Sequence, residues 1–128
     1  MTKHRHFIIH KPYNYLSQFI LVTNRKTKLL GELYDFPPNT MAIGRLDKTT
    51  EGLLFLTTDG KMSEKVRSKK VEKEYYAQVD GIIDDTAIEK MKTGVEIGIR
   101  NEKYITRPCK AKKLIPPPDF PPRIVKIR

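Results

Sequence analysis

The chain has 128 residues, of which 38% are hydrophobic and 31% charged, enough for one domain with one modest core. No apolar run approaches the roughly 20 residues that span a bilayer, and the apolar stretch at residues 7–9 is too short for a signal peptide, so we expect a cytoplasmic protein. The formal net charge is +10, which favours attraction to nucleic acid, although a solvated basic surface is the plain alternative.

The first half of the chain is predicted to contain mainly strands. In chain order we expect a strand at residues 5–10, a candidate strand at 19–22, a short helix at 28–34, a loop at 35–39, a strand at 41–43 and a strand at 53–57. The first strand ends before Pro12, because proline cannot donate a backbone hydrogen bond to a sheet. The last is an apolar run, which is the pattern of a strand buried on both faces.

The second half is predicted to alternate helices and strands. Asp59 is a candidate N-cap for a helix that runs to about Ser68, and Thr86 and Glu89 have the spacing of a capping box that opens a helix ending at Thr93. The other predicted elements are strands at 75–79, 95–99 and 108–115, an extended proline-rich connector at 116–122 and the opening of another strand at 123–128. This mixed order indicates a single α+β domain over residues 1–128.

The loop between the strands predicted at 41–43 and 53–57 carries the residues best suited to chemistry. Residues 44–52 read Gly-Arg-Leu-Asp-Lys-Thr-Thr-Glu-Gly, with glycines at both ends that permit tight turns and the close approach of a ligand. Such a loop can present the carboxylate of Asp47 to a bound substrate. The alternative is a charged turn in which Asp47 caps its own backbone.

The segment at residues 44–60, GRLDKTTEGLLFLTTDG, closely resembles the signature of the small-ribosomal-subunit-type pseudouridine synthases, which isomerise uridines in ribosomal RNA. Two flanking pieces agree. His-Lys-Pro-Tyr at 10–13 is similar to the Lys-Pro turn after the first strand of these domains, and Lys-Glu-Tyr at 73–75 is similar to the family's Lys-x-Tyr strand. The resemblance covers residues 5–128 and looks closest to the branch called ribosomal large subunit pseudouridine synthase E.

This resemblance implies both a fold and a reaction. The fold is the pseudouridine synthase catalytic-domain fold, a mixed and mainly antiparallel sheet flanked by helices, here without its C-terminal part. The reaction is the isomerisation of a specific uridine to pseudouridine in RNA, here 23S ribosomal RNA, with Asp47 as the nucleophile and with no cofactor or metal. Arg45 is implied in filling the space that the flipped base vacates, and Tyr75 in stacking on that base.

The family pattern continues past a proline connector into a basic motif that pairs with the catalytic aspartate, whereas this sequence ends at Arg128, before such a motif. We therefore expect little or no turnover from these 128 residues alone, and an open sheet edge that favours self-association. Two alternatives stay open. One is a catalytically inactive RNA-binding fragment or module of the same fold, and the other is a ribosome-associated structural protein in which the motif is a coincidence.

Basic residues are the candidates for contacts with RNA phosphates. They outnumber acidic residues in the stretches 1–30, 61–73 and 100–113. The RNA-binding residues that we predict are Lys11, Lys69, Lys70 and Lys73.

Histidine and cysteine give no prediction of a metal site. His4, His6 and His10 alternate along the first predicted strand, but no acidic or cysteine partner lies near them in the sequence. Cys109 is the only cysteine, which excludes an intrachain disulfide, and no reactive-thiol motif surrounds it.

Overall fold

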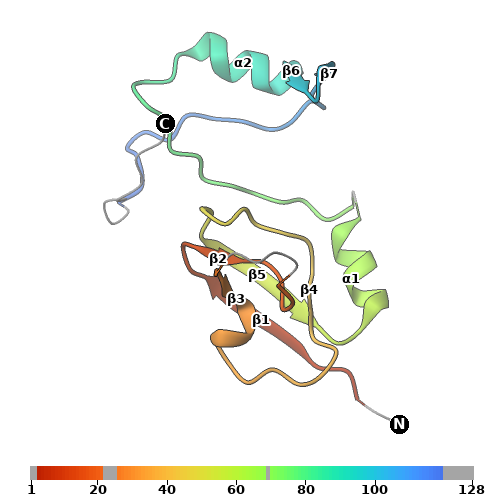
Figure 1. Cartoon of the computed structure of the whole chain (residues 1–128). Helices are drawn as coiled ribbons and strands as arrows, with labels where there is room; N and C mark the ends of the chain where they lie inside the picture. The colour runs from red at the N-terminus through yellow and green to blue at the C-terminus, as the bar shows by residue number, and fades with distance from the viewer. Residues whose placement is uncertain (1–2, 22–25, 69, 120–128) are drawn as a thin grey trace. The chain divides into compact units, whose positions relative to one another are not determined.

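The computed structural model describes residues 3–21, 26–68 and 70–119. The chain divides into two compact units, Met1–Glu74 and Tyr75–Arg128, and each is described by itself. The first unit contains β1 (His6–Lys11), β2 (Tyr15–Leu16), β3 (Lys28–Leu29), the 3-10 helix η1 (Leu30–Glu32), β4 (Met41–Ala42), β5 (Gly52–Thr57) and α1 (Gly60–Arg67) (Figure 1). The second contains α2 (Asp85–Thr93), β6 (Glu96–Ile99) and β7 (Glu102–Ile105). None of the helices in the described ranges has the length and apolar character needed to cross a membrane.

The core of the first unit lies on one face of a three-stranded antiparallel sheet, in the order β1-β5-β4. Alternate residues of β1 and β5 share this face, where Phe7 pairs with Leu56 and Ile9 with Leu54. Leu54 and Leu56 form a buried cluster with Leu30 of η1. Burying a leucine side chain contributes about 1.5–3 kcal/mol, so the short 3-10 helix is fixed mainly by the core that it covers.

The expectation that the strand at 53–57 is buried on both faces is wrong, because only its inner face meets the core. Leu53 is 62% exposed and Phe55 is 37% exposed, whereas Thr57 is fully buried at the end where α1 contacts β5. Phe55 lies opposite Ile8 in the sheet, and Ile8 is 69% exposed. The outer face of this sheet therefore leaves apolar side chains accessible in the described part of the unit.

The segment between β1 and β4 forms less regular structure than its sequence predicts. β2 and β3 are two-residue strands that pair in parallel, and η1 supplies a single turn where a helix at 28–34 is expected. Residues 19–21 form no strand, while position 22 lies outside the described residues. Phe19 instead packs edge-to-face against Phe36, with ring centroids 5.5 Å apart. This segment is therefore anchored by aromatic packing rather than by the backbone hydrogen bonds of a strand.

Two helices begin at aspartate N-caps. Asp59 accepts a hydrogen bond from the backbone N–H of Lys61 at 3.0 Å and opens α1, as predicted. The expected capping box at Thr86 is wrong, because Asp84 caps α2 by accepting from the N–H of Ala87 at 2.7 Å. The predicted helix end at Thr93 is confirmed.

The described strands of the second unit are those of one hairpin, and they differ in part from the predicted ones. β6 confirms the strand expected near 95–99, and it pairs with β7, a strand that no sequence pattern predicts. Residues 75–79 and 108–115 were expected to be strands but form none, since neither has a strand partner among the described residues. The described part of the connector, residues 116–119, contains neither helix nor strand, and positions 120–128 lie outside the described residues.

Candidate active site

The loop from Gly44 to Gly52 joins β4 to β5 and presents Asp47. Both glycines have positive backbone angles, with φ of 75° at Gly44 and 141° at Gly52, which side chains disfavour. Inside the loop the N–H of Thr50 donates to the carbonyl of Asp47 at 2.9 Å, which closes a turn. Asp47 is exposed, so its carboxylate is available to a ligand while its backbone forms part of this turn.

The residue before Asp47 is held by a serine from the segment after β2. The Ser17 hydroxyl donates to the carbonyl of Leu46 at 2.9 Å and accepts from the N–H of the same residue at 3.0 Å. The Leu46 side chain packs against the buried core cluster. The backbone and the side chain of Leu46 are therefore both fixed.

The residue after Asp47 is held by a buried lysine. Lys11 is fully buried at the end of β1, and its ammonium donates to the carbonyls of Pro12 at 3.0 Å, Tyr15 at 2.9 Å and Lys48 at 3.3 Å. Burial lowers the pKa of Lys11 below its ordinary value, and the negative charge of Asp47 partly opposes that shift. The predicted phosphate contact of Lys11 does not fit this position, because a group enclosed by three carbonyls is not presented to RNA.

Asn14 also holds the carbonyl of Lys48. The backbone N–H of Asn14 donates a hydrogen bond to the Lys48 oxygen at 2.9 Å. Asn14 has a φ of 70°, in the left-handed region that asparagine tolerates better than most residues. Neither Asn14 nor Ser17 was singled out from the sequence. The only signal is an asparagine and a serine shortly after the Lys-Pro turn.

The other predicted site residues lie in different settings. Arg45 is exposed on the loop, two residues before Asp47. Tyr75 is 63% exposed and belongs to the second unit. Lys70 is exposed just after α1, and Lys69 lies outside the described residues. Lys73 is exposed, and its ammonium donates to the carbonyls of Ser68 at 2.9 Å and Val71 at 2.7 Å, which leaves part of its donor capacity for a phosphate.

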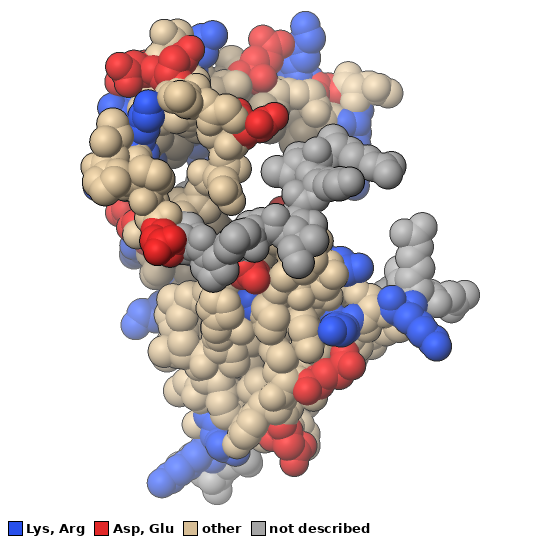
Figure 2. Space-filling model, turned by 90° about the vertical axis from the view of Figure 1, so that its left-hand side faces the viewer, with Lys and Arg blue, Asp and Glu red and all other residues tan. Residues whose placement is uncertain are grey.

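Charged side chains do not gather in one place on the face that Figure 2 draws. Among the residues coloured there, lysine and arginine side chains are scattered and interleaved with acidic ones, with uncharged surface between them. An excess of positive charge spread in this way attracts a polyanion at long range, but this face has no single basic groove within the described residues.

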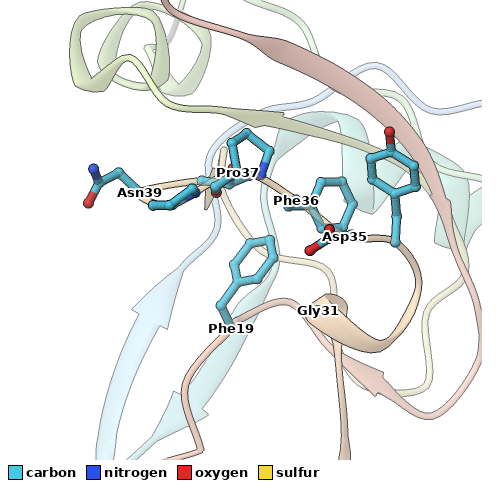
Figure 3. Close-up of a pocket in the computed structure, with 9 residues that line it drawn as sticks. Phe19, Gly31, Asp35, Phe36, Pro37 and Asn39 are labelled. Atoms are coloured by element: carbon cyan, nitrogen blue, oxygen red, sulfur yellow. The ribbon is translucent and has the colours of Figure 1, made fainter. Parts of the chain in front are cut away.

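The hollow drawn in Figure 3 does not include the Asp47 loop. It has a volume of about 270 Å³ and is lined by Phe19, Gly31 and residues 34–40. The Phe19 ring faces Phe36 and Pro37, so aromatic and proline side chains form much of the wall (Figure 3). Across the part of the chain that the structure describes, no three His, Cys, Asp or Glu side chains are grouped as a metal site.

The arrangement around Asp47 is that of an exposed carboxylate on a backbone held on both sides. The ammonium of Lys11 and the carboxylate of Asp47 attract each other, because their charges are opposite. A carboxylate presented in this way can act as a nucleophile or as a base toward a bound substrate.

Comparison with known proteins shows which family the chain resembles. Residues 5–116 match the family model for RNA pseudouridylate synthase. A protein of Xanthomonas axonopodis pv. citri called ribosomal large subunit pseudouridine synthase E is 33% identical over 123 residues, which cover 94% of this chain and 62% of that protein. Its namesake from Vibrio parahaemolyticus is 42% identical over 94 residues, covering 70% of this chain and 37% of that protein.

Two further relatives agree. A protein of Aquifex aeolicus called an uncharacterized RNA pseudouridine synthase is 35% identical over 95 residues, covering 73% of this chain and 38% of its own length. A solved structure described as a pseudouridylate synthase superposes with a TM-score of 0.64 at 23% identity, covering 89% of this chain and 48% of the other, and shows that the fold is shared. The chain thus spans between 37% and 62% of the length of these three sequence relatives. With a family match over most of its residues, the chain belongs to the RNA pseudouridylate synthase family.

Proposed function

We propose that this chain contributes the catalytic aspartate for the isomerisation of a uridine to pseudouridine in ribosomal RNA of the large subunit. The observation that carries the proposal is the loop at Asp47, whose exposed carboxylate lies between Leu46 and Lys48. The side chain of Ser17 holds the backbone of Leu46, and the side chain of Lys11 holds the carbonyl of Lys48. The choice of large-subunit RNA follows from the printed names of the relatives from Xanthomonas axonopodis pv. citri and Vibrio parahaemolyticus.

The proposed reaction moves one glycosidic bond and leaves the atoms balanced. The bond between N1 of uracil and C1′ of ribose breaks, the base turns, and a bond between C5 and C1′ forms. A proton leaves C5 and a proton is taken up at N1, so the reaction needs no oxidant or reductant. The carboxylate of Asp47 either attacks C1′, which forms a covalent intermediate, or assists deprotonation at C2′.

The uridine must leave its stack to reach an exposed loop, at a cost of a few kcal/mol. We propose that Arg45, two residues before Asp47, fills the vacated space and that Tyr75 stacks on the flipped base. Lys70 and Lys73, and Lys69 outside the described residues, contact phosphates without reading the sequence.

A second candidate function is RNA binding without catalysis by the same fold. The observation that favours it concerns the charge next to the candidate nucleophile. Among the described residues, no ion pair joins a lysine, arginine or histidine to the Asp47 carboxylate.

The experiment that tests the proposal has two arms. In the first, the 128-residue chain is kept in excess over unmodified 23S ribosomal RNA, so that one slow turnover is detectable. In the second, the same chain is followed by the C-terminal part of the Xanthomonas axonopodis pv. citri relative. We expect little pseudouridine in the first arm and ready formation in the second. RNA that is bound but contains no pseudouridine in either arm would overturn the proposal and support the binding module.

A further inference from the structure

We propose that Ser17 is a positioning residue for Asp47, acting through the backbone of Leu46. The inference rests on the proposed function of Asp47. A hydroxyl has one proton to donate and lone pairs with which to accept, and Ser17 uses both on one residue, donating to the Leu46 carbonyl at 2.9 Å and accepting from its N–H at 3.0 Å.

These two bonds take the place of a neighbouring strand. In an antiparallel ladder, the N–H and C=O of one residue point to the same side, and a single opposite residue meets both. Leu46 has no such strand partner among the described residues, and it lies in the loop between the end of β4 at Ala42 and the start of β5 at Gly52. The Ser17 hydroxyl supplies both bonds instead, at the residue directly before Asp47.

The hold at Leu46 has a counterpart on the other side of Asp47. The carbonyl of Lys48 accepts from the buried ammonium of Lys11 and from the N–H of Asn14. Residues 11–17 thus contact the backbone on both sides of the candidate nucleophile. Without Ser17 the Lys48 side stays fixed. On the Leu46 side, the packing of the leucine side chain is then the remaining contact within the described residues, so the Asp47 carboxylate is expected to sample more orientations.

This loosening predicts an effect on rate that is separate from binding. A displacement of about 1 Å at a reacting group can lower a rate about a hundredfold. If Ser17 had only a structural role, replacing it would lower stability. Its effect on turnover would then be no larger than that of an equally destabilising substitution elsewhere in the fold. Ser68 offers a matched control, because its hydroxyl also donates to a backbone carbonyl, that of Lys65, at 2.7 Å.

The test compares Ser17→Ala, Ser17→Thr and Ser68→Ala. In the 128-residue chain, hydrogen exchange of the Leu46 amide reports directly on the hydrogen bond that this amide donates to the Ser17 hydroxyl. In the faster of the two assay arms, two quantities report the consequence for catalysis: the single-turnover rate constant with the protein saturating over RNA, and the Kd for RNA. For Ser17→Ala we expect Leu46 exchange to be faster by about tenfold or more, the rate constant to be lower by about 10- to 100-fold, and Kd to change less than about twofold.

The two other variants fix the interpretation. Ser17→Thr keeps the hydroxyl and is expected to retain the slow exchange of Leu46 and at least about a third of the parent rate. Ser68→Ala is expected to leave both unchanged. The inference is overturned if Ser17→Ala leaves Leu46 exchange or the rate constant as in the parent, or if Ser68→Ala lowers the rate equally. A parent without turnover in both arms overturns the proposed function instead, while the exchange data still decide whether Ser17 holds Leu46.

Discussion

The buried ammonium of Lys11 donates a hydrogen bond to the carbonyl of Lys48, the residue that follows Asp47, at 3.3 Å. The same group donates to two carbonyls nearer in sequence, those of Pro12 and Tyr15. One lysine therefore ties the end of β1 to the loop that carries the candidate nucleophile.

Replacing this lysine is expected to destabilise the first unit. Lys11→Met keeps much of the side-chain volume but leaves three carbonyls without this donor, so we expect a loss of about 1.5–3 kcal/mol in the free energy of unfolding, as for hydrogen bonds to charged groups. Urea unfolding measures it. Lys3→Met, at an exposed position, removes the same charge and is expected to change stability by less than about 0.5 kcal/mol. Equal effects of the two substitutions would contradict the account.

The lowered pKa of Lys11 predicts how stability depends on alkaline pH. Because the pKa is lower in the folded state than the unfolded value of 10.5, the unfolded chain binds more protons between the two values, and stability attributable to this group rises with pH there. The stability of the parent relative to Lys11→Met is therefore expected to grow as the pH rises through the alkaline range toward 10.5. A relative stability that stays flat or falls over this range would be inconsistent with a buried lysine.

Gly52 is expected to tolerate no side chain without strain. It lies opposite Lys11 in the sheet and has a φ of 141°, while its surroundings leave space for a methyl group. Gly52→Ala is therefore expected to cost about 1–3 kcal/mol from backbone conformation alone. Gly60→Ala, in the first turn of α1 with equally open space and no positive φ, is expected to be neutral or slightly stabilising. Thermal unfolding separates the two, and equal shifts in Tm would refute the strain argument.

RNA affinity is expected to depend steeply on salt. Each phosphate contacted on a single strand contributes about −0.7 to the log–log slope of affinity against salt concentration. Lys70→Glu is expected to weaken binding to different RNA sequences alike, as is the same substitution at Lys69. Glu64→Gln, which removes an exposed negative charge from α1, is expected to strengthen binding. A flat salt response, or a loss confined to one RNA sequence, would show that these charges do not govern affinity.

The sheet and the loop are the parts of the fold that the sequence predicts well. The apolar segments near 5–10, 41–43 and 53–57 became β1, β4 and β5 because their alternate residues share one core face. The glycines at 44 and 52 were expected to shape the loop, and both adopt positive φ. These features are local, so pattern and turn chemistry suffice to find them.

Features that depend on distant partners were not predicted. Lysine is rarely buried, so the enclosure of Lys11 by three carbonyls carries no local signal. The Ser17 contact with Leu46 joins residues 29 positions apart. The hairpin of β6 and β7 turns at Arg100 and Asn101, both with positive φ, and lacks the glycine that usually marks such a turn. Self-association through an open sheet edge stays a prediction.

The central claim is that Asp47 performs the chemistry, and Asp47→Asn tests it most directly. The substitution keeps the shape of the side chain and removes its negative charge. Asp35→Asn, at another exposed aspartate of the first unit, is the control. In the faster assay arm, with the protein saturating over RNA, we expect Asp47→Asn to abolish detectable pseudouridine while RNA binding is largely kept, and Asp35→Asn to behave as the parent. An Asp47→Asn rate above about a hundredth of the parent rate would contradict the assignment of Asp47 as the nucleophile.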